Sequence, residues 1–235
     1  MVNIDTVYQR VLVLANKEQR GYITPQEFNL FANHVQLTIF EQYFYDLNQF
    51  VRTPTNGVEY SDILELLNQK ISHFKTGNVG PLPFGNGTFM LPLDLYRLGT
   101  VVWRGPFGLE ADREVTEINR DKFVSANLSP LTRPDQDRPV YWKIGDAIVV
   151  RPGNIVNEIR CSYIRRPRRV EWGYVVVEEK ALYNPATTQH FEMHRTEEVE
   201  LVNAIAALAG ISMKQPILSQ QGTGLNVMKT QQEKL

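Results

Sequence analysis

The hydrophobic positions at the start of the chain recur at helical spacing. Between residues 4 and 15, apolar side chains stand three and four positions apart, as they do on one face of an amphipathic helix. Asn3 precedes the run and suits an N-cap, and Gly21 ends it. The predicted buried face consists of Ile4, Val7, Tyr8, Val11, Leu12 and Ala15.

A second helix begins at the strongest local signal in the sequence. Thr24 offers a capping hydroxyl, Pro25 suits the first helical position, and Glu27 can reach back to the backbone N–H of Thr24. The helix then carries a wide, aromatic-rich stripe that must be covered. Its members are Phe28, Phe31, Ala32, Val35, Ile39, Tyr43, Phe44 and Leu47.

Two interpretations of this stripe stay open. It is either an ordinary core or, in part, a face buried between identical subunits, because apolar side chains continue onto a second side of the helix. In the second interpretation the subunit interface contains Phe28, Phe31, Tyr45 and Phe50.

A third helix follows a turn at residues 53–57 and completes a helical region over residues 1–76. Its predicted apolar face consists of Ile63, Leu66, Leu67, Ile71 and Phe74.

From Gly77 the pattern changes to short extended segments, after a glycine- and proline-rich break at residues 77–87. A two-residue turn, Gly145-Asp146, joins two of these segments as a hairpin. The sequence predicts a β domain over residues 77–195, an antiparallel sandwich or a partly open barrel. The expected strands are 88–91, 96–103, 114–118, 140–144, 147–151 and 158–164.

A last helix is predicted at residues 196–211, packing on the helical region, with Thr196 at its start and Gly210 at its end. Its apolar face consists of Val199, Val202, Ile205, Ala206 and Ala209. Residues 212–235 lack a periodic apolar face and are expected to be a flexible tail that orders on a partner. The fold class is therefore α+β, with a helical bundle, a central β region, a C-terminal helix and an extended tail.

Composition excludes several classes of protein. Among 235 residues, 43% are hydrophobic and 22% charged, as in globular proteins rather than disordered ones. The lone Cys161 allows no intrachain disulfide, and a net charge of -1 provides no overall basic field for nucleic acid. Neither a signal peptide nor a run of roughly 20 apolar residues is seen, so we expect synthesis in the cytoplasm and no membrane partner.

Candidate chemistry is sparse. His190 and His194 flank Glu192, which in an extended segment suits either a weak surface metal site or, as we favour, a solvated strand edge or interface. There is no Walker loop, nucleophile elbow or dinucleotide fingerprint. We therefore predict no catalytic, cofactor-binding or metal-binding residue, and a protein that is not an enzyme. The alternative is a small hydrolase whose site uses Asp94, Asp112 and Glu114.

A run of four arginines around Pro167 is the clearest electrostatic feature. It reads as a solvated strand end, as a patch that docks on an acidic protein surface, or as a phosphate contact with passing DNA. The run consists of Arg165, Arg166, Arg168 and Arg169.

Three segments resemble the head-to-tail connector, or adaptor, proteins of short-tailed bacteriophages and the ring proteins of crAss-like phages. The most specific is residues 15–32, which is similar to the opening of structural proteins in such phages. Residues 90–98 resemble the step with which adaptors enter their β region. Residues 139–152, followed by 161–167, resemble the paired strands of neck and tail proteins.

This resemblance implies a structural virion protein without a cofactor, located in the neck or tail. About twelve copies would form a ring under the portal protein, seat the next tail or ring protein, and surround passing double-stranded DNA without sequence specificity. A more distal tail component, a tube or hub protein, is the structural alternative. The resemblance also implies that the tail contacts the portal through Met213, Pro216, Ile217, Leu218, Leu225 and Val227.

Overall fold

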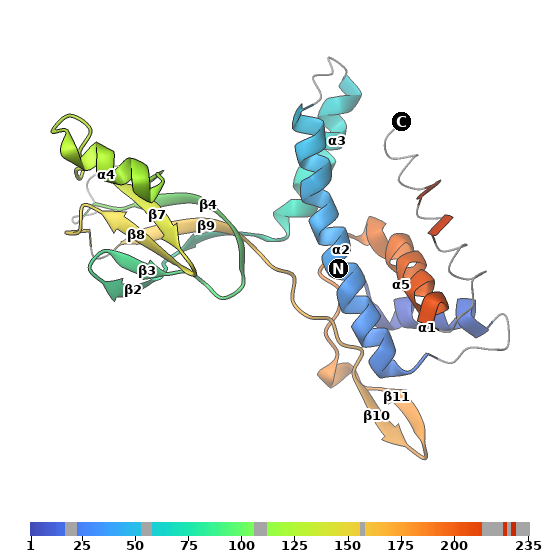
Figure 1. Ribbon diagram of the computed structural model, residues 1–235. Helices are drawn as coiled ribbons and strands as arrows, with labels where there is room; N and C mark the ends of the chain where they lie inside the picture. Colours follow the sequence, from blue (N-terminus) through green and yellow to red (C-terminus); the bar gives the residue numbers. More distant parts are fainter. Residues whose placement is uncertain are drawn as a thin grey trace. The chain divides into compact units, whose positions relative to one another are not determined.

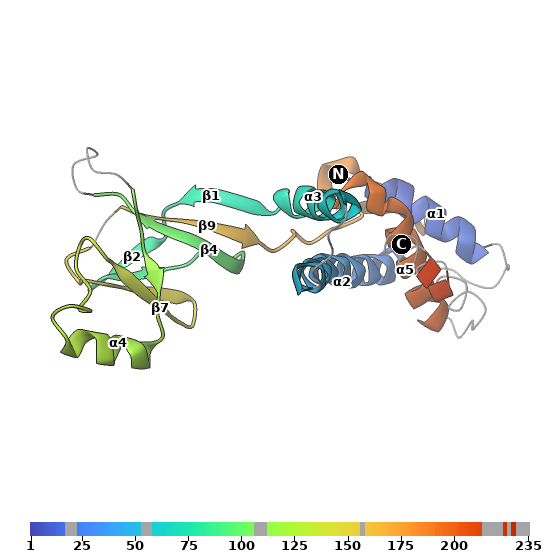
Figure 2. The same cartoon turned by 90° about the horizontal axis from the view of Figure 1, so that it is seen from above.

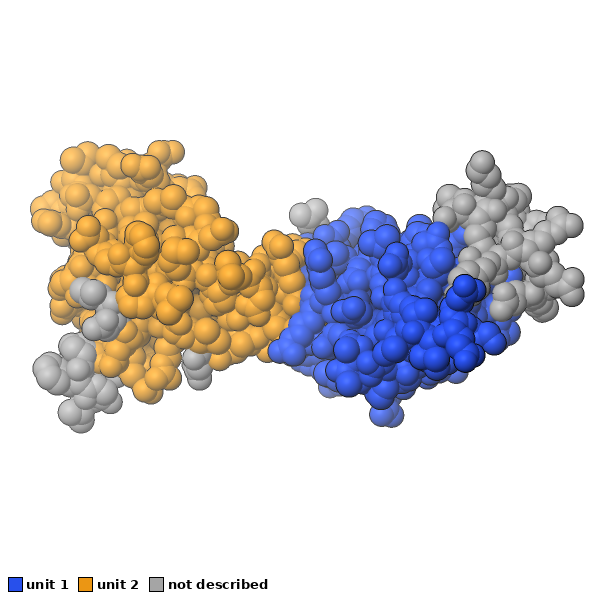
Figure 3. Space-filling view, turned by 90° about the horizontal axis from the view of Figure 1, so that it is seen from below, with its two compact units in different colours: residues 1–73, 167–235 blue, residues 74–166 orange. Residues whose placement is uncertain are grey.

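The computed structural model describes residues 1–16, 23–52, 58–105, 112–155 and 158–212, with two short stretches at 223–224 and 227–228. Within these ranges the fold is mixed α+β, as predicted, with five α-helices and three separate sheets (Figure 1). The chain divides into two compact units (Figure 3). The helical unit contains residues 1–73 and 167–235, and the β unit contains residues 74–166.

Four helices build the helical unit. Helix α5 packs against α1 and α2, and α3 packs against α2. Their bounds are α1 Ile4–Asn16, α2 Pro25–Arg52, α3 Val58–Ser72 and α5 Glu198–Ser212.

The predicted starts of α1 and α2 are confirmed, whereas α5 begins at Glu198 rather than at Thr196. The backbone N–H of Thr24 donates to Glu27 Oε2 at 3.0 Å, and the N–H of Glu27 donates to Thr24 Oγ1 at 3.3 Å. The hydrogen bond from the Thr24 backbone lowers the pKa of Glu27. Asn3 Oδ1 accepts from the N–H of Asp5 at 2.9 Å and caps α1.

The predicted helix faces are largely buried, with two corrections. Leu66 on α3 and Val199 on α5 are exposed, whereas Leu67 and Ile71 of α3 are buried together with the charged Lys70. The buried side of α3 therefore includes Lys70 as well as Leu67 and Ile71, and excludes Leu66.

The β unit contains a four-stranded sheet in the order β1-β9-β4-β5 and a five-stranded sheet in the order β2-β3-β8-β7-β6. Figure 2 shows β1, β9 and β4 of the first sheet lying side by side. Helix α4, Arg120–Leu128, was not expected from the sequence and buries none of its residues. The strand bounds are β1 Lys75–Val79, β2 Leu82–Gly85, β3 Thr88–Met90, β4 Leu95–Trp103, β5 Arg113–Glu114, β6 Thr116–Glu117, β7 Val140–Ile144, β8 Ala147–Arg151 and β9 Ile159–Arg165.

The β7–β8 hairpin confirms the predicted Gly145-Asp146 turn, since Ile144 pairs with Ala147 and Gly145 has a positive φ of 57°. Apolar residues of both sheets share one core, which includes Phe89, Trp103 and Ile148. No sheet in the described part of the chain is closed into a barrel. The expected sandwich arrangement and flexible tail stay predictions.

Two expectations for this region are corrected. Most of the predicted break at residues 77–87 belongs to strands β1 and β2. β2 tolerates Pro83 because it is an edge strand, where the missing N–H of proline costs no ladder hydrogen bond. The single strand predicted at 114–118 is two strands. β5 pairs with β4, and β6 pairs with β7, on either side of the buried Val115.

The expected domain range, 77–195, differs from the observed one. The β unit begins at Phe74 and ends at Arg166, where β1 and β9 run antiparallel with Lys75 paired to Ile164. Residues 167–195 return to the helical unit, because side chains of α2 bind their backbone.

Candidate interaction site

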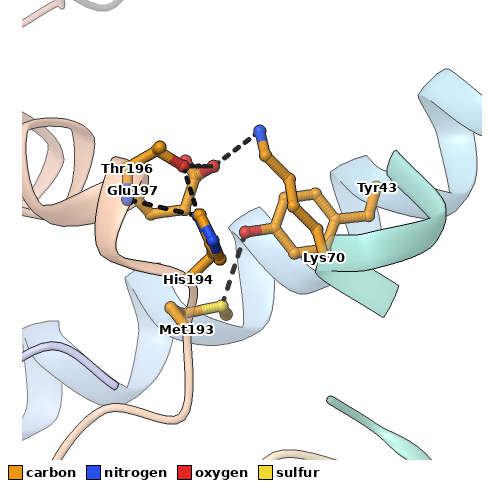
Figure 4. A network of polar contacts seen from close by, with 6 residues as sticks. All are labelled: Tyr43, Lys70, Met193, His194, Thr196 and Glu197. Atoms are coloured by element: carbon orange, nitrogen blue, oxygen red, sulfur yellow. Dashed lines mark hydrogen bonds and ion pairs between the residues drawn. The ribbon is translucent and has the colours of Figure 1, made fainter. Parts of the chain in front are cut away.

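A buried ion pair joins α3 to the start of α5 (Figure 4). Lys70 Nζ lies 2.6 Å from Glu197 Oε1, and the two side chains are only 8% and 1% exposed. The ammonium group also lies 5.5 Å from the ring centroid of Tyr43, whose hydroxyl is 3.6 Å from the sulfur of Met193. Because each charge satisfies the other, these contacts hold α2, α3 and α5 in one arrangement.

The candidate metal residues serve the fold instead. His194 Nδ1 lies 2.9 Å from Thr196 Oγ1 and accepts from the Thr196 N–H, so it caps the short 3-10 helix Arg195–Glu197. His190 Nδ1 accepts from the N–H of Ile4 at 3.4 Å. Glu192 is buried rather than on a solvated edge. Within the described ranges, no three His, Cys, Asp or Glu side chains are grouped so as to hold a metal ion.

Side-chain amides on α2 bind the returning backbone like the edge of a sheet. Asn33 Nδ2 donates to the carbonyl of Val170 at 2.8 Å, and its Oδ1 accepts from the Val170 N–H at 3.1 Å. Asn29 makes the same pair of bonds with Trp172, at 3.4 and 2.8 Å. Two residues that lie four positions apart on α2 therefore bind alternate residues of the extended segment.

The third rung of this carboxamide ladder is only half complete. Gln36 Nε2 donates to the carbonyl of Arg168 at 2.7 Å, while the Arg168 N–H donates to Glu192 Oε2 at 3.0 Å. Gln36 is 1% exposed, and its Oε1 has no hydrogen-bond partner among the described residues. The ladder, defined by Asn29, Asn33 and Gln36, sets the register of residues 168–172 on α2.

The ladder ends at Trp172, which anchors a β-hairpin. The indole of Trp172 is buried, its Nε1–H donates to Asp5 Oδ1 at 2.9 Å, and its ring lies 4.4 Å from that of Tyr8. Tyr174 and Tyr183, the paired residues at the base of the hairpin, lie 5.9 and 5.8 Å from the Trp172 ring. These contacts join the base of the hairpin to α1 through Trp172.

This hairpin, β10 Tyr174–Val177 with β11 Lys180–Tyr183, was not predicted from the sequence. It projects from the helices of its unit (Figure 1) and forms a sheet of its own. Its two strands expose large apolar side chains on both faces: Val175, Val176, Val177, Leu182 and Tyr183. Apart from its base at Trp172, the hairpin therefore presents an apolar surface to solvent in the single chain.

The turn of the hairpin explains why it was missed. Glu178 and Glu179 occupy the two central positions, with φ of 48° and 63°. A tight hairpin turn of this kind favours Asn-Gly or Gly-Gly, because those residues adopt positive φ at little cost. The detectable signal was the matched pair of short, apolar segments on either side of two glutamates.

A cavity of about 250 Å³ lies along α2, beside Asn33 and Gln36 of the ladder. Its apolar lining comes from Leu30, Leu37 and Pro167, and Arg169 adds a positive charge. Leu30 and Leu37 are both exposed although they are large and apolar. The cavity and the hairpin thus form two different apolar surfaces of the same unit.

The predicted arginine run is divided between the two units. Arg165 and Arg166 end the β unit, and the Arg165 guanidinium lies 5.8 Å from the Phe74 ring centroid. Arg168 and Arg169 belong to the helical unit and are exposed, with Arg168 Nε 3.8 Å from Glu192 Oε1. Of these four arginines, Arg169 lines the cavity on α2.

The predicted subunit-interface residues have different positions. Phe28 is fully buried in its own unit, 4.7 Å from the Tyr8 ring, so its side chain is core rather than interface. Phe31 is half-buried and Tyr45 is exposed. The side chain of Phe50 lies outside the described residues.

The predicted portal-contact tail is described only in part. Val227 lies in a described stretch and is half exposed. The remaining members lie outside the described residues: Met213, Pro216, Ile217, Leu218 and Leu225.

The carboxylates of the alternative hydrolase site do not form a metal-binding group within the described part of the β unit. Asp94 Oδ1 accepts from the Tyr163 hydroxyl at 3.0 Å, and Asp112 forms an ion pair with Arg104 at 3.4 Å. Glu114 lies in β5, opposite Val102 of β4. Exposed apolar residues of this unit include Leu82, Phe84, Leu93, Leu128 and Leu131.

No described helix is both long enough and apolar enough to cross a membrane. No protein-family model matches the chain, and no curated protein matches its sequence.

Proposed function

We propose that this protein is a non-enzymatic structural subunit of a virion, a head-to-tail adaptor that forms an oligomeric ring under the portal. In this role it extends the DNA channel and seats the next tail component. The observation that carries the proposal is the exposed apolar hairpin β10–β11, packed at its base on the buried Trp172. A surface of this kind is typical of a protein that works by binding other chains.

The organisation of the helical unit supports the same proposal. A subunit of a ring must present the same contact surface in every copy, which requires a fixed orientation of that surface. The carboxamide ladder and the Trp172 contacts provide such orientation for the hairpin. The resemblance of residues 15–32, 90–98 and 139–152 to phage neck proteins gives the proposal its place in the virion.

The test is native mass spectrometry with negative-stain imaging of the full chain, alone and after mixing with the portal ring from the same genome. We expect a ring of about a dozen copies that binds the portal. Assembly without portal binding would move the protein to the distal tail alternative. A protein that stays monomeric in both experiments would refute the structural role.

A matched pair of variants tests the part played by the hairpin. Val176 on the hairpin and Val124 on α4 are similarly exposed, at 63% and 58%. Val176→Lys is expected to abolish assembly, because it places a charge in the contact surface, whereas Val124→Lys should assemble like the natural chain. Equal assembly of both variants would remove the hairpin from the interface.

A further inference from the structure

We infer that the hairpin β10–β11 of one copy docks into the α2 cavity of the next copy. This inference rests on the proposed function, because it specifies the contact by which the ring closes. The partner is therefore a second copy of this chain, and the contact joins two different surfaces of the same unit.

The first argument is chemical match. The hairpin offers β-branched side chains at Val176 and Val177, and the cavity offers Leu30, Leu37 and Pro167. Its volume of about 250 Å³ is below the roughly 300–1,000 Å³ of small-molecule sites, and suits protruding side chains better than a drug-sized ligand.

The second argument is complementary charge. Glu178 and Glu179 stand together at the exposed tip of the hairpin, directly after the valines. Arg169 lines the cavity, and the neighbouring Arg168 is 73% exposed. No ion pair of Glu178, Glu179 or Arg169 is formed inside the described part of one copy. A hairpin that enters the cavity would bring these opposite charges together.

The third argument is direction. Along α2 the ladder pairs Gln36 with Arg168, Asn33 with Val170 and Asn29 with Trp172, so the bound segment runs toward the N-terminal end of the helix. The hairpin follows Trp172 at the end of this segment, whereas the segment contributes Pro167 and Arg169, from its start, to the cavity. A copy therefore presents its hairpin and its cavity at different places, as a head-to-tail contact requires.

Contacts of this type close a ring when the rotation between copies is a whole fraction of a turn. They also leave every hairpin covered and every cavity filled, with no free end. This distinguishes the inferred contact from a two-fold dimer, in which hairpin would meet hairpin.

Charge reversal tests the contact. Arg169→Glu alone, and Glu178→Lys with Glu179→Lys, are each expected to weaken assembly at least about 10-fold, and their combination should restore it to within about 3-fold of the natural chain. Assembly is measured by sedimentation velocity across protein concentration, with the portal ring present if the natural chain requires it. Unchanged assembly of either reversed variant, or no recovery in the combination, would overturn the inference.

Two controls keep a folding defect from imitating the result. Glu178→Asn with Glu179→Gly removes both charges while it improves the turn, so it should weaken assembly although the hairpin is retained. Circular dichroism and thermal unfolding of every variant check the fold. Normal assembly of this Asn-Gly variant would show that the tip charges do not act in the contact.

Cysteine cross-linking gives a residue-level test. Val176→Cys combined with Leu37→Cys should yield a ladder of covalent oligomers on oxidation, because each copy contributes one cysteine to each of two contacts. Val176→Cys combined with Leu93→Cys is the control and should give no ladder. Dimers formed by Val176→Cys alone would indicate hairpin-to-hairpin contact and overturn the inference.

The outcomes separate this inference from the proposed function. A natural chain that forms the ring, with reversed-charge variants that form it equally well, refutes the hairpin-to-cavity contact only. A natural chain that forms no oligomer with or without the portal refutes both.

Discussion

The ammonium group of Lys70 and the carboxylate of Glu197 meet inside the helical unit at 2.6 Å, and both side chains are almost completely buried. Lys70→Met is expected to lower the free energy of unfolding by about 3–5 kcal/mol, because it removes the buried cation that compensates the Glu197 charge. Replacing both residues, Lys70→Met with Glu197→Leu, should cost less than the single substitution. Urea unfolding measures both changes.

The partly exposed ion pair between Arg10 and Glu198, at 2.7 Å, is the control. Arg10→Met should cost no more than about 1 kcal/mol, since water and salt screen such pairs. An equal cost for Arg10→Met and Lys70→Met would contradict the special role of burial.

The middle rung of the carboxamide ladder is expected to stabilise the returning segment strongly. Asn33→Ala leaves both the N–H and the carbonyl of Val170 without their partners, so we expect a loss of about 2–4 kcal/mol. Hydrogen exchange of the Val170 amide should accelerate with it. Thr38→Ala, which removes an exposed bond to the His34 carbonyl on the same helix, should change stability by less than about 1 kcal/mol.

The raised pKa of Tyr141 leads us to expect a loss of folding stability at high pH. Burial, and then the carboxylate of Glu117, raise the pKa of Tyr141 to about 12. The unfolded chain loses this proton near its ordinary pKa of 10.0 while the folded chain keeps it. The stabilisation is therefore complete below pH 10 and is lost as the pH rises through 12.

Comparison of the natural chain with Tyr141→Phe isolates this effect. The natural chain should lose up to about 3 kcal/mol more stability between pH 10 and 12 than the variant does. Ultraviolet titration of tyrosinate should lack one late-titrating group in the variant. A variant with the same pH slope as the natural chain would contradict the assignment.

The thiol of Cys161 should be unreactive in the folded protein. Burial raises the pKa of Cys161, and its Sγ lies 3.3 Å from the carbonyl of Val79. Because the thiolate is the reacting form, we expect modification by Ellman's reagent to be on the order of 100-fold slower than in urea. Leu93→Cys adds an exposed thiol and should give one fast phase. A fast phase in the natural chain would show that the β core opens readily.

Local sequence information determined the elements that depend on neighbouring residues. The capping box at Thr24 and Glu27, the apolar face of α1, and the Gly145-Asp146 hairpin were all predictable, because each depends on residues within a few positions. The mixed α+β class followed from the change between helical and alternating patterns.

Tertiary structure decided the rest, because the interactions responsible join residues far apart in the sequence. The ladder from Asn33 to Val170 binds the returning segment to the helical unit, and the pairing of Lys70 with Glu197 joins α3 to the start of α5. Neither pairing has a signature in local spacing. The sequence did not predict the hairpin, because two glutamates occupy its turn in place of the usual Asn-Gly or Gly-Gly. The exposure of its apolar side chains depends on how the helices pack, which is a property of the tertiary structure.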